Sequence, residues 1–274
     1  MANLEPRDRS IITNGIRLHY VEWGQESRQA VIMLHGGLAH ARVWDNFARE
    51  AQGLYRIICL DQRGHGDSDW ADNYASQEHV LDMEGIIGQL DLQQPILIGH
   101  SMGGRNAITY AFKHPGQLAK LIIVDMAPQI SHRMAASSTN NPPDPGVFDS
   151  ETEAVAFLQK QARYPSYETL QHAIHHSLKS REDGRLVWKW DPSMRTKPRV
   201  AEPDMWPMLQ NIDCPTLMVR GNDSPAIDPE VAERMIQVLP NGKLVEIKCA
   251  EHSVHEDNPK AFNIAVLNFL GSGS

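Results

Sequence analysis

The segment Gly99-His100-Ser101-Met102-Gly103 has the pattern G-x-S-x-G, and its place in the chain decides the predicted fold. The apolar run 95–98 before it predicts a buried strand, and the helical periodicity around Ala107 predicts a helix directly after it. A serine on such a sharp strand-to-helix turn has an exposed hydroxyl, and small neighbours prevent steric clashes there. The helix N-terminus also directs backbone N–H groups toward a developing oxyanion. We therefore expect Ser101 to be a nucleophile.

Short apolar runs on both sides of this segment alternate with stretches of helical periodicity. The predicted strands are 30–34, 56–60, 95–98, 121–124, 215–219 and 244–247. Near the start of the chain, Asn14-Gly15 predicts a tight turn that joins two more strands. This alternation predicts an α/β fold, in which a mostly parallel sheet carries helices on both faces.

The regular alternation fails between about residues 127 and 206. A Pro-rich loop at 141–146 and two helical stretches near 151–162 and 167–179 occupy this region. We therefore expect a core domain in two parts, with a helical cap inserted between them. The predicted boundaries are 1–126 for the first part of the core, 127–206 for the cap and 207–270 for the second part, and 271–274 form an appended tail outside the fold.

Composition excludes several classes of protein. The 274 residues include 41% hydrophobic and 22% charged residues, which is typical of a compact globular protein. The formal charge of −8 leaves no basic surface for nucleic acid or an anionic membrane. The sequence contains no run of about 18 apolar residues, so we expect no membrane span. Cys59, Cys214 and Cys249 are odd in number and far apart, so we expect reduced core residues and a cytoplasmic protein.

A G-x-S-x-G can arise by chance in a chain with 19 glycines, but two further motifs follow in the required order. His35-Gly36-Gly37-Leu38 comes after the strand 30–34, where an oxyanion-hole donor is expected; we assign that role to the N–H of Gly37, together with the N–H of Met102. His252 follows the last predicted strand and can reach Ser101. We expect it to be the general base, because an imidazole pKa of about 6.5 suits both accepting and returning a proton.

The predicted cap supplies two further groups of candidates. His172, His175 and His176 have helical spacing, but no Cys, Asp or Glu accompanies them at a recognisable spacing, so we predict a solvent-exposed helix face and no metal or organic cofactor. Aromatic and apolar side chains have two open roles, which are lining a substrate pocket and packing the cap onto the core. The candidate pocket residues are Leu38, Phe157, Tyr164 and Trp188.

Together these motifs resemble the α/β-hydrolase superfamily, and so do the segments Asp61–Ser68, Pro215–Gly221 and His252–His255. The resemblance covers about residues 8–270. It implies an eight-stranded sheet whose first hairpin is antiparallel, and a mobile cap over the active site. Because a serine and not an aspartate stands at position 101, the resemblance favours a substrate with an acyl carbonyl over a haloalkane or an epoxide.

The third catalytic residue departs from the common family pattern. Many members place an acid where this chain has Ser224, and Asp223 is one residue early, which turns its side chain to the opposite side in extended chain. Asp125 begins Asp-Met-Ala-Pro and keeps the order Ser, Asp, His. The chain thus resembles carboxylesterases with an Asp-x-Ala-Pro and a Gly-x-x-Ser-Pro motif, which implies Asp125 as the acid and Ser224 as a support for His252. Asp223 stays the alternative acid, and a capping or turn-forming role for Asp125 stays open.

Three functions remain open at this stage. The first is hydrolysis of a carboxylic ester, either a small or apolar acyl ester or a lactone, through a Ser-His-Asp triad and an acyl-enzyme. The second is hydrolysis of a carbon–carbon bond in a ring-cleavage diketone, and the third is a small-ligand receptor with a slow or idle triad. We expect a small-molecule ester as the partner and a monomer or homodimer as the assembly.

Overall fold

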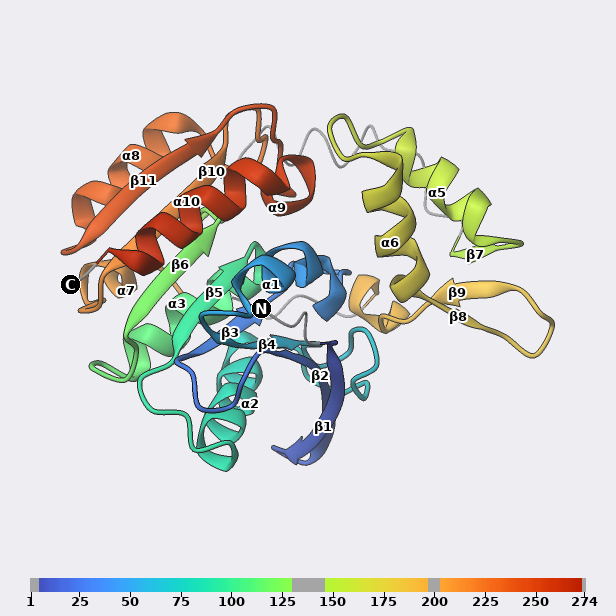
Figure 1. The fold of residues 1–274 in the computed structure, drawn as a ribbon, viewed down its shortest axis with the longest axis horizontal. Helices are drawn as coiled ribbons and strands as arrows, with labels where there is room; N and C mark the ends of the chain where they lie inside the picture. The colour runs from blue at the N-terminus through green and yellow to red at the C-terminus, as the bar shows by residue number, and fades with distance from the viewer. Residues whose placement is uncertain (1–4, 130–145, 197–202, 273–274) are drawn as a thin grey trace.

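The computed structural model describes residues 5–129, 146–196 and 203–272, and eight strands of the described chain form one sheet (Figure 1). The strands are β1 (Arg7–Thr13), β2 (Ile16–Trp23), β3 (Ala30–Leu34), β4 (Arg56–Leu60), β5 (Ile96–His100), β6 (Lys120–Val124), β10 (Thr216–Gly221) and β11 (Gly242–Ile247). Their spatial order is β1-β2-β4-β3-β5-β6-β10-β11. Strand β2 pairs antiparallel with β1 and β4, and every other neighbouring pair is parallel. The predicted sheet and its antiparallel opening hairpin are confirmed.

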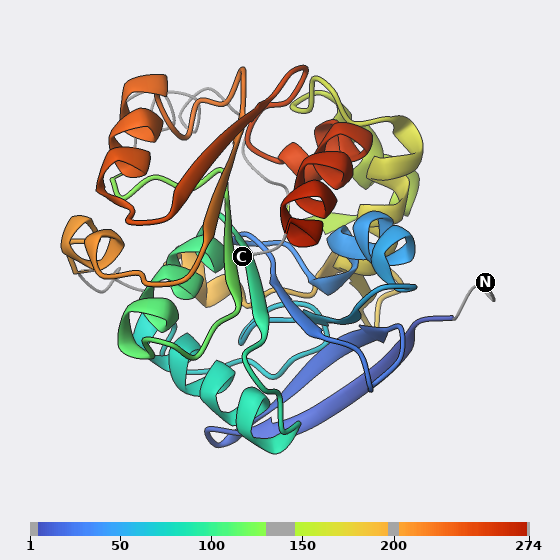
Figure 2. The ribbon, with the colours of Figure 1, turned by 60° about the vertical axis from the view of Figure 1, so that its left-hand side comes forward.

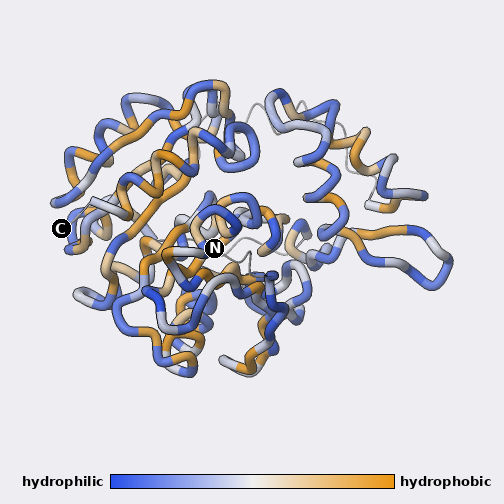
Figure 3. Tube along the Cα trace, in the orientation of Figure 1, coloured by the Kyte–Doolittle hydropathy of each residue, from blue (hydrophilic) through white to orange (hydrophobic). Residues whose placement is uncertain are grey.

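Helices cover both faces of this sheet, as the turned view in Figure 2 shows. One face carries α2 (Ser76–Gln89), α3 (Met102–Lys113), α7 (Trp206–Gln210) and α8 (Pro229–Val238); the other carries the 3₁₀ turn η1 (Ala41–Trp44), α1 (Asp45–Ala51), α9 (Val254–Asp257) and α10 (Pro259–Gly271). Both faces are covered because successive side chains of a strand point to opposite faces and are apolar on each. In β3, Ile32 and Leu34 lie in one hydrophobic core, while Val31 and Met33 lie in the other. A strand buried on both faces is apolar throughout, and Figure 3 shows hydrophobic colour along the central strands.

Residues 146–196 belong to the region predicted as a cap, and we use the word cap below for these residues only. They contain a hydrophobic cluster of their own, centred on Phe148, Val155 and Ile174. The elements here are β7 (Val147–Phe148), α5 (Glu151–Gln159), α6 (Tyr167–Ser177), β8 (Leu178–Ser180), β9 (Leu186–Trp188) and η2 (Pro192–Arg195). The two helices lie where the sequence predicted them, but the antiparallel sheet β7-β9-β8 was not predicted, because two or three residues are too few to show alternation. Most of the Pro-rich loop, residues 141–145, lies outside the described residues.

The structure tests the predicted burial of the cysteines and the predicted lack of a membrane span. Cys59 and Cys214 are buried as expected, but the prediction for Cys249 is wrong, because its side chain is exposed. Cys249 follows the edge strand β11 and has a φ of 52°, which places it in a turn beyond the core. Within the described chain, no helix is both long enough and apolar enough to span a bilayer.

Helix α3 approaches the sheet so closely that two glycines leave no room for a side chain. A Cβ atom at Gly103 would lie 2.4 Å from the carbonyl oxygen of Leu34, and one at Gly99 would lie 2.3 Å from the carbonyl oxygen of Gly103. Both clashes are with backbone, which cannot rotate away. The steric reason predicted for glycine at positions 99 and 103 is therefore confirmed.

We predict that Gly103→Ala lowers the free energy of unfolding by about 1–3 kcal/mol, since overpacking against a fixed backbone forces α3 away from β3. Gly88→Ala is the matched control, because Gly88 also lies in a helix and a Cβ there meets nothing within 4 Å. This control should gain about 0.5–1 kcal/mol from helix propensity. Urea unfolding followed by circular dichroism measures both values, and equal stability of the two variants would contradict the packing constraint.

Candidate active site

Ser101 lies at the turn between β5 and α3 with φ 50° and ψ −114°, a backbone conformation that non-glycine residues rarely adopt. Such a conformation costs about 1–3 kcal/mol and persists only where the surroundings hold it. Here the Ser101 N–H donates to the carbonyl of Val124 at 3.0 Å, and the Ser101 carbonyl accepts from the N–H of Arg105 at 3.0 Å. These bonds fix the turn to β6 and to α3, so the serine is held in one orientation.

Three side chains from distant parts of the sequence form a hydrogen-bonded chain at this turn. The Nε2 atom of His252 lies 3.0 Å from the Oγ of Ser101, and its Nδ1 atom lies 2.8 Å from the Oδ2 of Asp125. A carboxylate only accepts, so the ring proton belongs on Nδ1, which leaves Nε2 free to take the proton of Ser101. Asp125 is fully buried, whereas the His252 side chain is 24% exposed. The structure therefore brings together the predicted nucleophile, base and acid.

The buried carboxylate of Asp125 receives further hydrogen bonds from the loop after β10. The N–H of Gly221 donates to its Oδ1 at 3.0 Å, and the hydroxyl of Ser224 donates to its Oδ2 at 2.5 Å. Ser224 therefore reaches His252 through Asp125 and does not bond to the ring itself. Ser224 orients the acid, and Asp125 in turn orients the histidine.

Asp223, the alternative acid, faces the cap. The turn closed by the bond from Ser224 N–H to the carbonyl of Gly221 directs Ser224 inward and Asp223 outward. The Asp223 carboxylate accepts a hydrogen bond from the hydroxyl of Tyr164 and lies 3.9 Å from Arg163. The Tyr164 bond lowers the pKa of Asp223 and raises the pKa of Tyr164 to about 12. Asp223 thus links core and cap, and within the described residues it makes no hydrogen bond to the His252 ring.

The loop after β3 runs directly against the nucleophile. A Cβ atom at Gly36 would lie 2.6 Å from Nδ1 of His100 and 3.4 Å from the Cβ of Ser101, so this loop touches the turn. Gly37 follows immediately and has open space around it. Met102 begins α3, so its N–H belongs to the first turn, whose donors lack partners within the helix. The oxyanion-hole roles of Gly37 and Met102 remain our prediction, and this placement supports them.

The candidate pocket residues do not form one group. Phe157 and Trp188 pack around Phe148 inside the cap, with ring centroids 5.9 Å and 5.1 Å from its ring. Tyr164 bonds to Asp223, while Leu38 lies in the loop after β3 and is 39% exposed. The contacts of Phe157 and Trp188 therefore give these two residues a packing role. Leu38 belongs to the loop after β3, and Tyr164 contacts the loop after β10.

Two histidines beside the triad have roles that sequence reasoning missed. The Nε2 of His100 lies 2.8 Å from the carbonyl oxygen of His252 and donates to it, because a carbonyl only accepts. Burial holds the pKa of His100 well below its usual range, so the ring stays neutral. His255 stacks on Trp44 at 4.1 Å, and burial lowers its pKa to about 3. The position of His100 inside the G-x-S-x-G motif was the available signal.

The profile of the alpha/beta hydrolase fold family matches residues 29–259. This chain belongs to that family. It is similar to a 2-hydroxy-6-oxononadienedioate/2-hydroxy-6-oxononatrienedioate hydrolase of Paraburkholderia xenovorans, with 26% identity over 93% of this chain and 91% of the relative. An sn-1-specific diacylglycerol lipase of Mus musculus is 26% identical over 90% of this chain and 82% of its own length. The crystal structure of an E-2-(acetamidomethylene)succinate hydrolase superposes with a TM-score of 0.86 at 23% identity, over 98% of this chain and 100% of that one.

We predict that Asp125→Asn lowers kcat by about 10⁴, because the amide no longer holds the required tautomer of His252. Ser224→Ala should cost about tenfold, since it removes one neutral donor to Asp125. Asp223→Asn is the matched carboxylate control and should retain kcat within a few fold. The measurement is kcat on one simple ester for folded variants, and a crippled Asp223→Asn beside an active Asp125→Asn would reassign the acid.

We also predict that acid destabilises the protein partly through His255. In the unfolded chain a histidine has a pKa of about 6.5, whereas the folded value is about 3. Between these values the unfolded chain binds the extra proton, so the free energy of unfolding falls as pH falls. His255→Phe keeps a ring against Trp44 and should reduce this slope by up to about 1.4 kcal/mol per pH unit. Urea unfolding at several pH values tests this, and identical slopes in both proteins would refute it.

Proposed function

We propose that this protein is a serine hydrolase that cleaves carboxylic esters through a covalent acyl-enzyme. The observation that carries the proposal is the continuous relay from Ser101 Oγ through His252 to Asp125, with distances of 3.0 Å and 2.8 Å. The first distance allows His252 to take the proton of Ser101, and the second holds the ring in the tautomer that this transfer needs. The hydrogen bond from His252 also gives the fully buried carboxylate of Asp125 a partner.

The reaction follows from the positions of these groups. His252 Nε2 takes the proton of Ser101 while Oγ attacks the ester carbonyl, and the N–H groups of Gly37 and Met102 stabilise the oxyanion. The C–O bond to the leaving alcohol breaks as His252 returns its proton to that oxygen. Water then loses a proton to His252, attacks the acyl-serine and releases the carboxylic acid with Ser101 restored.

Hydrolysis of a carbon–carbon bond in a ring-cleavage diketone is the second candidate. The relative from Paraburkholderia xenovorans carries the name of such a hydrolase, and at 26% identity over 93% of this chain it favours this chemistry. The same triad would serve, but the leaving group is carbon, so the returned proton must reach a carbon atom. Small or apolar acyl esters and lactones need no such delivery, which is why we place ester hydrolysis first.

We predict that Ser101→Ala lowers ester turnover by about 10⁶, because the nucleophile is lost while the small alanine side chain keeps the packing of the turn. A fluorophosphonate probe should label the parent protein at Ser101 and leave Ser101→Ala unlabelled, as peptide mass spectrometry shows. Labelling at another serine would refute the nucleophile assignment.

Turnover of p-nitrophenyl acetate, a panel of lactones and a ring-cleavage diketone by the same preparation separates the candidates. We expect a higher kcat/KM on esters or lactones than on the diketone, and the reverse order would favour the carbon–carbon hydrolase. Tight binding of an ester with no turnover by the parent protein would instead favour a receptor with an idle triad.

A further inference from the structure

Cap helix α6 and core helix α1 bring together two histidines and an aspartate outside the candidate active site. His172 and His176 are four residues apart on α6, so their side chains lie on the same face of the helix. Asp45 begins α1 on the opposite side of the interface. One ligand atom from each of the three residues lies within 4.8 Å of the others. The sequence showed no acidic partner for these histidines, and the fold supplies one from the core.

The carboxylate of Asp45 has an unusual environment for a buried charge. Asp45 is only 4% exposed. Its Oδ2 lies 3.2 Å from Nε2 of His172 and 3.5 Å from a guanidinium nitrogen of Arg42. Its Oδ1 is fully buried and has no hydrogen-bond partner within the described parts of the chain. A buried carboxylate with an unpartnered oxygen is unfavourable, and a cation bound to this carboxylate would offset the burial of its charge.

We propose that Asp45, His172 and His176 form a binding site for a divalent cation of the zinc class. Two imidazole nitrogens and one carboxylate oxygen are ligands that Zn²⁺ accepts, and water would complete its tetrahedral shell.

The proposed site lies where α6 meets the core. His176, one of its three ligands, lines a cavity of about 290 Å³, which His40 and Asp61 also line. At present α6 is joined to the core here by hydrogen bonds from His40 to the carbonyl of Ala173 and from His172 to the carbonyl of Arg42. Coordination by both elements would add a direct link between cap and core.

A second group, formed by His19, Asp61 and Asp67, also has metal-ligand spacing but is already satisfied. The Asp61 carboxylate accepts from the N–H groups of Ala41 and Asp67, at 2.6 Å and 2.9 Å, and lies 2.7 Å from the His19 ring. The Asp67 carboxylate pairs with a lysine of the cap. The orphaned oxygen of Asp45 therefore distinguishes the proposed site from this one.

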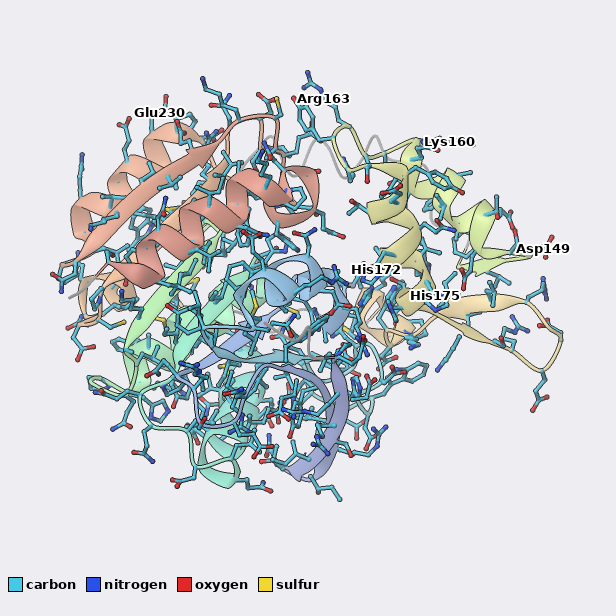
Figure 4. The ribbon with its side chains drawn as sticks, in the orientation of Figure 1. Asp149, Lys160, Arg163, His172, His175 and Glu230 are labelled. Carbon is cyan, nitrogen blue, oxygen red and sulfur yellow. The ribbon has the colours of Figure 1, made fainter. Side chains whose placement is uncertain are left out.

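The test uses the full chain without a histidine tag, titrated with ZnCl₂ by calorimetry and with CoCl₂ by visible absorption. We expect one Zn²⁺ per chain, a raised Tm, and a Co²⁺ spectrum typical of tetrahedral coordination. His172→Ala, His176→Ala and Asp45→Asn should each lose the calorimetric signal and the Tm shift. His175→Ala is the matched control, because His175 lies on the same helix (Figure 4) but bonds to Glu151 of α5, and it should bind like the parent protein.

Asp67→Asn is the second control and should also retain binding, since it removes a ligand from the other group only. The proposal is overturned if the parent protein binds no Zn²⁺, if His172→Ala and His176→Ala bind it as well as His175→Ala does, or if Asp67→Asn abolishes binding. Circular dichroism checks that each variant is folded. If Asp45→Asn fails to fold, the two histidine variants decide the outcome, because their side chains lie at the surface of α6 and are not fully buried.

Discussion

The close approach of α3 to β3 and β5 is the constraint on which the rest of this structure depends. A Cβ atom at Gly99 or Gly103 would lie within 2.4 Å of a backbone oxygen of α3 or β3. Glycine at these two positions therefore lets the helix begin this close to the sheet. The chain can then reverse at Ser101 only by adopting a positive φ of 50°. Backbone hydrogen bonds to β6 and within α3 stabilise this strained conformation, and they hold the Ser101 side chain in one orientation.

The parallel sheet explains why the other reactive groups gather at this point. The carboxyl ends of neighbouring parallel strands lie at one edge of a sheet, and crevices outside that edge bind ligands in open α/β folds. The loop that contains Gly36 and Gly37 follows β3, Ser101 follows β5, Asp125 follows β6, and Ser224 follows β10. A backbone N–H, a hydroxyl and the His252 ring all donate to the buried carboxylate of Asp125, so its oxygens have partners inside the protein.

The cap meets the core through polar contacts, whereas its apolar residues pack on one another around Phe148. Tyr164 bonds to Asp223, His40 bonds to the carbonyl of Ala173, and the Trp70 indole donates to the carbonyl of Lys189. Interfaces of this polar kind allow relative movement of the parts they join. A cation held by Asp45 and α6 would restrain the same interface.

The sequence by itself determined the sheet, most of its helices, Ser101 and His252, because these depend on local patterns. It favoured Asp125 over Asp223 only through a resemblance, and the structure decided between them. Apolar runs that fit a strand buried on both faces, glycines around Ser101, and the order Ser, Asp, His are all visible along the chain. The exposure of Cys249 and the bond from Ser224 to Asp125 were not visible, since a turn at the end of each strand decides which way a side chain points. Only the tertiary structure placed Asp45 beside His172 and His176 and directed Phe157 and Trp188 into the cap. The contacts of Asp45 with the two histidines join segments far apart in the chain. They form only when the cap packs onto the core, so a local sequence pattern cannot predict them.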